Sequence, residues 1–178
     1  MRENCHATSD PREPSVSLAN HATPSEARGR PRAPRADPPP DRRLGKLDIL
    51  LVDDDPADTS LILSALAFHP DVAAVRAVDA PVLALRQLLV GYRQPDLVLL
   101  DLHMPRLDGF EVLEGLRRIA GMATVPVVFL TTSELDKDLG AYRRSSASMY
   151  VVKPDTFDEL RIRTDGIVER ALSGVWYE

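Results

Sequence analysis

Near-continuous apolar runs that stop abruptly at polar residues constrain this chain more than any other feature. The runs DILLV at Asp48–Val52 and DLVLL at Asp96–Leu100 are each followed at once by an aspartate, and PVVFL at Pro126–Leu130 is followed by Thr131. Apolar runs of this kind are typical of strands that are buried on both faces of a parallel sheet. The chain is therefore expected to build a parallel sheet whose strands end in polar loops.

Segments with helical spacing of apolar residues separate these runs and complete a regular alternation. Strands are predicted at residues 48–52, 72–78, 96–100, 126–130 and 148–152, and helices at about residues 57–68, 80–91, 109–120, 134–145 and 156–172. Expected N-caps are Asp79 and either Asp155 or Thr156, and Leu107-Asp108-Gly109 is expected to open the third helix. Five strand–helix repeats with fully buried strands favour a doubly wound α/β domain with a parallel sheet over a sandwich or a helical bundle.

The composition divides the chain near residue 46. Residues 1–46 hold 8 of the 15 prolines and no aromatic residue, and their only Leu, Ile, Val or Phe residues are Val16, Leu18 and Leu44. Such a segment cannot bury enough apolar surface to offset the entropy lost on ordering. We expect residues 1–46 to be a disordered Arg/Pro-rich tail, either a linker or the product of an upstream start site, and residues 47–178 to form the single domain.

Charge divides the chain at the same point, and it excludes several classes of function. Residues 1–46 carry a formal charge of +3, and residues 47–178 carry −8. An acidic domain lacks the clustered cations that a nucleic-acid binder needs, and it suits a cation site. The single cysteine, Cys5, permits neither an intrachain disulfide nor a cysteine metal cage. Since no apolar run approaches the ~20 residues of a membrane span, we expect a cytoplasmic protein without a membrane anchor.

Candidate site residues follow four of the five predicted strands. Asp53 and Asp54 follow the first, Asp101 the third, Thr131 the fourth and Lys153 the fifth. In doubly wound sheets the functional crevice lies beyond the carboxyl ends of the strands, so these side chains are expected to converge. Three carboxylates in one crevice repel one another unless a cation is bound, and Mg²⁺ is the hard divalent ion that uses few carboxylates. The sequence therefore predicts a magnesium site.

The remaining groups at this edge of the sheet suit phosphoryl chemistry. Lys153 and the cation together can stabilise a phosphoryl group, and the Thr131 hydroxyl can donate a hydrogen bond to one of its oxygens. Asp101 can act as a carboxylate nucleophile, which is an established role for aspartate in phosphoryl transfer.

These residues, in this order, resemble the receiver domain of two-component response regulators. The matching segments are Asp53-Asp54, Asp101–Pro105 with Asp108-Gly109, Thr131, and Tyr150–Pro154. The ending Val175–Tyr177 and the TTS at residues 131–133 resemble, more narrowly, stand-alone regulators of the phytochrome-associated type. The resemblance implies a flavodoxin-like five-stranded parallel sheet with the strand order 2-1-3-4-5.

The resemblance also implies a phosphoacceptor and a set of metal ligands. Asp101 would accept a phosphoryl group from a phosphohistidine, carried by a sensor histidine kinase or a histidine phosphotransfer protein. Asp54, Asp101 and the backbone carbonyl of His103 would bind Mg²⁺, and Asp53 would act on the ion mainly through water. The His103 side chain lies at a position that varies in the family and tunes loss of the phosphoryl group.

Three further residues take roles from the resemblance. Lys153 would pair with the phosphoryl group and with Asp101. Thr131 would move to bond a phosphoryl oxygen, and Tyr150 would be the switch aromatic that turns inward when the threonine moves. The chain departs from the family at residues 145–147 (SSA), where a glycine usually precedes the fifth strand, so the backbone of this loop is expected to differ.

Other interpretations of the same residues are weaker. Asp53–Asp55 is not a calcium loop, because Ala57 and Asp58 do not match the EF-hand pattern, and Asp55 is instead expected to be a solvated loop residue or a capping residue. Asp101-Leu102-His103 lacks the second aspartate of dehalogenase-type phosphatases. Thr132 and Ser133 are expected to be ordinary loop hydroxyls rather than phosphate ligands.

Three hypotheses of function follow. The first is a non-enzymatic, single-domain response regulator that signals through protein–protein contacts, with a homodimer through the receiver left open and no DNA-binding domain. The second is a phosphoryl sink or relay without an output of its own. The third is a phosphatase-like hydrolase, and the missing second aspartate counts against it.

Overall fold

The computed structural model describes residues 45–176. The predicted disordered tail therefore lies outside the described residues, apart from its last two positions. The elements, in chain order, are β1 (Leu47–Val52), α1 (Pro56–Leu66), β2 (Val72–Val78), α2 (Pro81–Leu89), β3 (Leu97–Leu100), α3 (Gly109–Arg117), β4 (Val127–Thr131), α4 (Asp136–Tyr142), β5 (Met149–Val152) and α5 (Phe157–Ser173). In this part of the chain no helix is both long and apolar enough to cross a membrane.

The five strands form one parallel sheet with the order β2-β1-β3-β4-β5. The predicted fold class and strand order are thus confirmed. In the centre of the sheet Val52 of β1 pairs with Leu100 of β3. The residues that follow them, Asp53 and Asp101, therefore lie at the same edge of the sheet. On the other side Thr131 pairs with Val152, which places the end of β4 beside Lys153.

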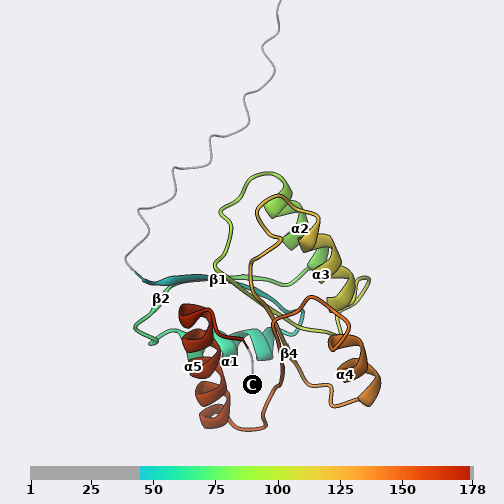
Figure 1. Ribbon diagram of the computed structural model, residues 1–178. Coiled ribbons are helices and arrows are strands. Elements are labelled where there is room, and N and C mark those ends of the chain that lie inside the picture. Colours follow the sequence, from blue (N-terminus) through green and yellow to red (C-terminus); the bar gives the residue numbers. More distant parts are fainter. Residues whose placement is uncertain (1–44, 177–178) are drawn as a thin grey trace, which may run out of the picture. The chain divides into compact units, whose positions relative to one another are not determined.

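Both faces of the sheet are covered by helices, which explains why the apolar runs show no polar alternation. Successive residues of β1, β3 and β4 enter two different hydrophobic clusters. One cluster is completed by α2 and α3, and the other by α1 and α5, which lie side by side below the sheet in Figure 1. Phe129 of β4 is fully buried and meets Phe110 edge to face, with ring centroids 4.9 Å apart.

One predicted N-cap is confirmed and one is wrong. Thr156 accepts a hydrogen bond from a backbone amide in the first turn of α5. Asp108, at the expected opening of α3, caps that helix in the same way. Asp79 does not cap α2, because Ala80 occupies the N-cap position and makes no side-chain hydrogen bond. Pro81 supplies the helix start instead, since its ring fixes φ at a helical value.

Four of the five helices, α1 to α4, are shorter than predicted, and the reasons are clearest for α3 and α4. α3 ends at Arg117, about one turn early, because the amide of Ile119 bonds three residues back instead of four. α4 covers 7 residues instead of 134–145. At its start the amide of Leu135 donates to Ser133 Oγ, and after its end the Ser145 hydroxyl donates to the carbonyl three residues back. These local hydrogen bonds compete with the helical pattern at both ends.

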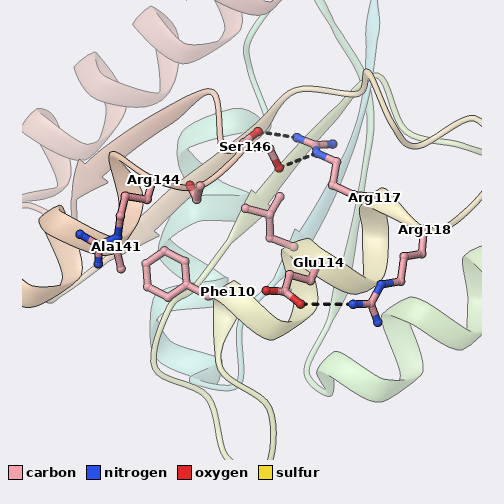
Figure 2. Close-up of a pocket in the computed structure, with 9 residues that line it drawn as sticks. Phe110, Glu114, Arg117, Arg118, Ala141, Arg144 and Ser146 are labelled. Carbon is pink, nitrogen blue, oxygen red and sulfur yellow. Dashed lines mark hydrogen bonds and ion pairs between the residues drawn. The ribbon is translucent and has the colours of Figure 1, made fainter.

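The loop before β5 needs no left-handed residue, although it lacks the family's glycine. Within residues 45–176, Arg106 is the only non-glycine residue with a positive φ. The segment is instead held from α3, where the Arg117 guanidinium donates to the hydroxyl and the carbonyl of Ser146 (Figure 2). The same guanidinium donates to the carbonyls of Met122 and Val125 in the segment before β4. An arginine clamp thus fixes the backbone of this loop.

Arg117→Ala is expected to lower the free energy of unfolding by about 2 kcal/mol, because several charge-assisted hydrogen bonds are lost together. Arg118→Ala is the matched control on the same helix. Arg118 makes only an exposed pair with Glu114 at 3.4 Å, so its loss is expected to change the free energy by less than about 0.5 kcal/mol (Figure 2). Urea denaturation of the two variants provides the comparison, and equal effects would contradict the clamp.

Candidate functional site

The ends of β1 and β3 bring three carboxylates together, as predicted. One oxygen from each of Asp53, Asp54 and Asp101 lies within 4.8 Å of the other two. Asp53 is 2% exposed and Asp101 is 7% exposed, so two of these charges are largely removed from water. Close burial of like charges is unfavourable without a cation.

The loop after β3 is built tightly around Asp101. The Asp101 amide donates to the Val52 carbonyl at 2.8 Å, and the Gly109 amide donates to the Leu102 carbonyl at 2.8 Å. A Cβ atom at Gly109 would lie 2.6 Å from the backbone oxygen of Asp101. Only glycine permits so close an approach of two backbone segments, and this accounts for the Asp108-Gly109 pair at the start of α3.

Lys153 reaches back from the end of β5 into the acidic cluster. Its Nζ atom lies 2.7 Å from Asp53 Oδ2, 2.8 Å from Asp58 Oδ2 and 3.3 Å from Asp101 Oδ1. Burial alone would lower the pKa of Lys153, but the hydrogen bonds to Asp53 and Asp58 raise it well above its ordinary value. The ammonium therefore stays charged. Asp58, from the first turn of α1, was not among the site residues predicted from the sequence. The only feature of the sequence that could have indicated it is its position shortly after the acidic pair.

Asp53 already has a partner on each oxygen. Its Oδ1 accepts from the Asp55 amide at 3.0 Å, and its Oδ2 accepts from Lys153. Burial raises the pKa of Asp53, although the hydrogen bond from Lys153 opposes this shift. Asp55 caps α1 by accepting from the Ala57 and Asp58 amides, as expected of a capping residue.

The residues present fit a hard divalent cation. Asp53, Asp58 and Asp101 contact one ammonium group, and Asp54 lies close to Asp53 and Asp101, which leaves a local excess of negative charge. All the donor atoms are oxygens, which Mg²⁺ prefers, and the cluster is small enough for one ion with water completing its shell. The chemistry of the donor set therefore supports the predicted magnesium site.

Thr131 and Tyr150 lie at the other end of the site. Thr131 is fully buried, and its Oγ1 accepts a hydrogen bond from the Ser133 amide at 3.3 Å. The Tyr150 hydroxyl donates to the Ser133 carbonyl at 2.7 Å, while its ring packs against Phe129 and Tyr142. Burial raises the pKa of the Tyr150 phenol. Both predicted switch residues thus contact the same loop residue, and their movement stays a prediction.

His103 contacts the site through its main chain and a helix through its ring. Its amide donates to Asp101 Oδ2 at 3.1 Å, and its ring Nε2 lies 2.9 Å from Asp138 Oδ2. Ser133 Oγ donates to the same Asp138 oxygen at 2.5 Å. Burial alone would raise the pKa of Asp138, but these two hydrogen bonds hold it below its ordinary value. Ser133 is thus more than the ordinary loop hydroxyl expected, and nothing in the sequence indicated Asp138.

Mg²⁺ is expected to stabilise the folded protein. At a concentration 100-fold above its Kd, the ion contributes about 2.7 kcal/mol, which corresponds to a rise in Tm of roughly 5–10 °C. Asp54→Asn is expected to remove most of this shift in differential scanning fluorimetry, and Asp71→Asn, in the turn before β2, is the control. An unchanged Tm for the unsubstituted protein at saturating Mg²⁺ would contradict the site.

The affinity for Mg²⁺ is expected to fall as the pH is lowered, because protons compete with the cation for the carboxylates. Since the pKa of Asp53 is raised, this competition begins at a higher pH than it would for an ordinary aspartate. Calorimetric titration with Mg²⁺ across the acidic range measures the effect, and a pH-independent Kd down to the ordinary pKa of aspartate would contradict it.

Comparison with known proteins gives the same picture. A model of the response regulator receiver domain matches residues 49–165. The probable methanogenesis regulatory protein FilR2 of Methanothrix harundinacea is 38% identical over 125 residues, which cover 68% of this chain and 81% of FilR2. The DNA-binding dual master transcriptional regulator RpaA of Synechocystis sp. is 35% identical over 124 residues, which cover 68% of this chain but only 49% of RpaA.

Solved structures with the same fold include metal-bound and phosphorylated forms. The phosphorylated cyanobacterial phytochrome response regulator RcpA is 31% identical, with a TM-score of 0.66, and the match covers 73% of this chain and 96% of that one. The Mn²⁺-bound response regulator Rcp1 is 30% identical, with a TM-score of 0.63, and the match covers 72% and 96%.

A third solved structure holds the predicted ion. The receiver domain of sensor histidine kinase PA1611 from Pseudomonas aeruginosa, with a magnesium ion in its active-site cleft, is 25% identical, with a TM-score of 0.61, and the match covers 72% of this chain and 98% of that one. The acidic cluster of Asp53, Asp54 and Asp101 fits the same cation. With its strand order, its acidic site and the family match over residues 49–165, this chain belongs to the response regulator receiver domain family.

Proposed function

We propose that this chain is a phosphoacceptor in a two-component phosphorelay, with residues 47–178 as its receiver domain and residues 1–46 as a tail. In this proposal Asp101 accepts a phosphoryl group from a phosphohistidine on a sensor histidine kinase or on a histidine phosphotransfer protein. The observation that carries the proposal is the cluster of Asp53, Asp54 and Asp101, two of which, Asp53 and Asp101, pair with the Lys153 ammonium.

The position of β3 in the sheet supports Asp101 as the acceptor. β3 lies between β1 and β4, so Asp101 lies between the acidic pair on one side and Thr131 on the other. A phosphoryl group on Asp101 would therefore have carboxylates for a cation on one flank and a hydroxyl on the other, with the Lys153 ammonium 3.3 Å from Asp101 itself. No other carboxylate of the cluster is placed between these groups.

The reaction needs one bond to break and one to form. An oxygen of Asp101 attacks phosphorus, the P–N bond of the phosphohistidine breaks, and the imidazole leaves with the electron pair of that bond. Asp54, Asp101 and the His103 carbonyl would hold Mg²⁺, with Asp53 acting through water, and the bound ion would supply positive charge that offsets the charge on the phosphoryl oxygens. Lys153 pairs with one oxygen, and the Thr131 hydroxyl donates a hydrogen bond to another.

We further propose that the protein is not an enzyme and that its output is protein–protein contact, including contact between two copies. The similarity to the protein-glutamate methylesterase of Bordetella pertussis, at 34% identity, covers only 34% of that protein, so its activity does not transfer to this chain. Histidine kinases take their phosphoryl group from ATP, and we therefore place this exchange in the cytoplasm. The alternative is a phosphoryl sink or relay, in which no contact depends on phosphorylation.

Acetyl phosphate, a small-molecule phosphodonor, tests the proposal directly. Incubation with acetyl phosphate and Mg²⁺ is expected to add the mass of one phosphoryl group, measured by intact-protein mass spectrometry, and EDTA is expected to prevent the addition. No added mass after prolonged incubation with Mg²⁺ would overturn the proposal. Addition that is equally fast in EDTA would overturn the role of the cation.

A measurement of self-association distinguishes a protein that signals through phosphorylation-dependent contacts from a phosphoryl sink or relay. Sedimentation of the phosphorylated and the unmodified protein over a range of concentrations is expected to show a phosphorylation-dependent dimer. If both forms sediment as the same species, and a cognate kinase binds both forms equally, the sink or relay is favoured instead.

A further inference from the structure

Asp138 is a buried carboxylate for which the proposed reaction gives no role. It lies in the first turn of α4 and is 6% exposed, whereas Asp136 in the same turn is exposed. A carboxylate is costly to bury unless hydrogen-bond donors surround it. Its Oδ2 atom receives two, the ring of His103 at 2.9 Å and the hydroxyl of Ser133 at 2.5 Å.

The first of these contacts leads to Asp101. The His103 amide donates to Asp101 Oδ2 at 3.1 Å, and the carbonyl of the same residue is the backbone ligand proposed for Mg²⁺. The His103 side chain is half exposed, at 48%, so packing alone does not fix its ring. Asp138 supplies the contact that holds the ring, and through it the main chain that faces the site.

The second contact leads to the switch residues. The Ser133 amide donates to Thr131 Oγ1 at 3.3 Å, and the Ser133 carbonyl accepts from the Tyr150 hydroxyl at 2.7 Å. A movement of Thr131 toward a phosphoryl group therefore displaces a residue whose hydroxyl is bonded to Asp138. The same carboxylate thus joins the β3–α3 loop, the β4–α4 loop and the start of α4.

We propose that Asp138 is a positioning residue that holds the His103 backbone at the metal site and ties the start of α4 to the loop of Thr131. The inference rests on the proposed function, because it deepens the roles of His103 and Thr131. A merely local role, in which an acidic residue stabilises the start of a helix, would be shared by Asp136. Asp136 is therefore the matched control.

Mg²⁺ affinity, measured by calorimetry on the full-length chain, tests the first contact without any phosphodonor. Asp138→Ala is expected to raise the Kd for Mg²⁺ about tenfold, the lower end of the range for residues that orient metal ligands, and Asp136→Ala is expected to change it less than about twofold. His103→Ala is expected to raise the Kd similarly, and adding Asp138→Ala to it is expected to have no further effect.

Asp138→Asn separates hydrogen bonding from charge. Asparagine keeps the shape and an acceptor for Ser133 but loses the charge, so its Kd is expected to lie between those of the unsubstituted protein and Asp138→Ala. If both variants weaken Mg²⁺ equally, or if Asp138→Ala acts equally strongly in the His103→Ala background, long-range electrostatics is the cause and the positioning role is wrong. If Asp138→Ala does not fold, the effect of Asp138→Asn on the Kd for Mg²⁺ is measured instead, in the unsubstituted protein and in His103→Ala. An equal effect in both would again contradict the positioning role.

Amide hydrogen exchange tests the second contact. The Ser133 amide is expected to exchange faster in Asp138→Ala than in Asp136→Ala, and unchanged protection would overturn the tie to the Thr131 loop. The two proposals fail in different ways. A chain that binds no Mg²⁺ and takes no phosphoryl group contradicts the proposed function, whereas a chain that does both, with Asp138→Ala behaving like Asp136→Ala, contradicts only the role of Asp138.

Discussion

Asp101→Asn is expected to abolish phosphorylation of this protein by small-molecule donors and by a cognate kinase. An amide oxygen carries no charge and is a poor nucleophile, so the acyl phosphate cannot form, whereas the shape of the side chain is retained. The rate of phosphoryl incorporation, followed by intact mass, is expected to fall below about 1% of the unsubstituted rate, in line with the loss of a group that acts as a covalent nucleophile.

A substitution of the same chemistry outside the site provides the control. Asp55 caps α1 and lies beside the acidic pair, and asparagine is an equally good N-cap. Asp55→Asn is therefore expected to be phosphorylated at nearly the unsubstituted rate. Incorporation into Asp101→Asn at a comparable rate would show that the acceptor is a different residue.

Lys153→Met is expected to have the second large effect, on stability as well as on phosphorylation. Methionine has a similar length but leaves Asp53, Asp58 and Asp101 without their shared cation. Removing one partner from a buried ion pair typically costs about 3–5 kcal/mol, and the Asp53 side chain is only 1% exposed. Urea denaturation near neutral pH, without Mg²⁺, measures the free energy of unfolding.

The decrease in the free energy of unfolding caused by Lys153→Met is expected to become smaller as the pH falls. Burial already raises the pKa of Asp53, and without the ammonium the folded state binds a proton still more tightly than the unfolded chain does. Stability therefore increases on acidification through the range between the two pKa values. Lys137→Met, at an exposed position of α4, is expected to change the free energy little at any pH. A pH-independent loss for Lys153→Met would contradict the charge-based explanation.

Most of the fold could be predicted because it is encoded locally. A strand that is buried on both faces needs an apolar run, and the ends of these runs identified Asp53, Asp54, Asp101, Thr131 and Lys153 as neighbours. The strand order came from the family resemblance, since local patterns do not encode it. Helix ends were less predictable, because side-chain hydrogen bonds from Ser133 and Ser145 shorten α4.

The parts of the site that the sequence did not reveal depend on tertiary packing. Asp58 is separated from Lys153 by 95 residues, and Asp138 from His103 by 35. Whether a carboxylate in the first turn of a helix faces the sheet or the solvent depends on how that helix is rotated, as the contrast between Asp136 and Asp138 shows. A single sequence contains no periodic signal that distinguishes these two residues.

The most direct test of the central claim is to locate the phosphoryl group after reaction with phosphoramidate, a donor with the same P–N bond as phosphohistidine. Borohydride reduces an acyl phosphate of aspartate to homoserine, which peptide mass spectrometry can assign to one residue. We predict homoserine at Asp101, dependent on Mg²⁺ and absent from Asp101→Asn. Homoserine at Asp53 or Asp54, a phosphoryl group on His103, or no modification at all would contradict the assignment of Asp101 as the phosphoacceptor.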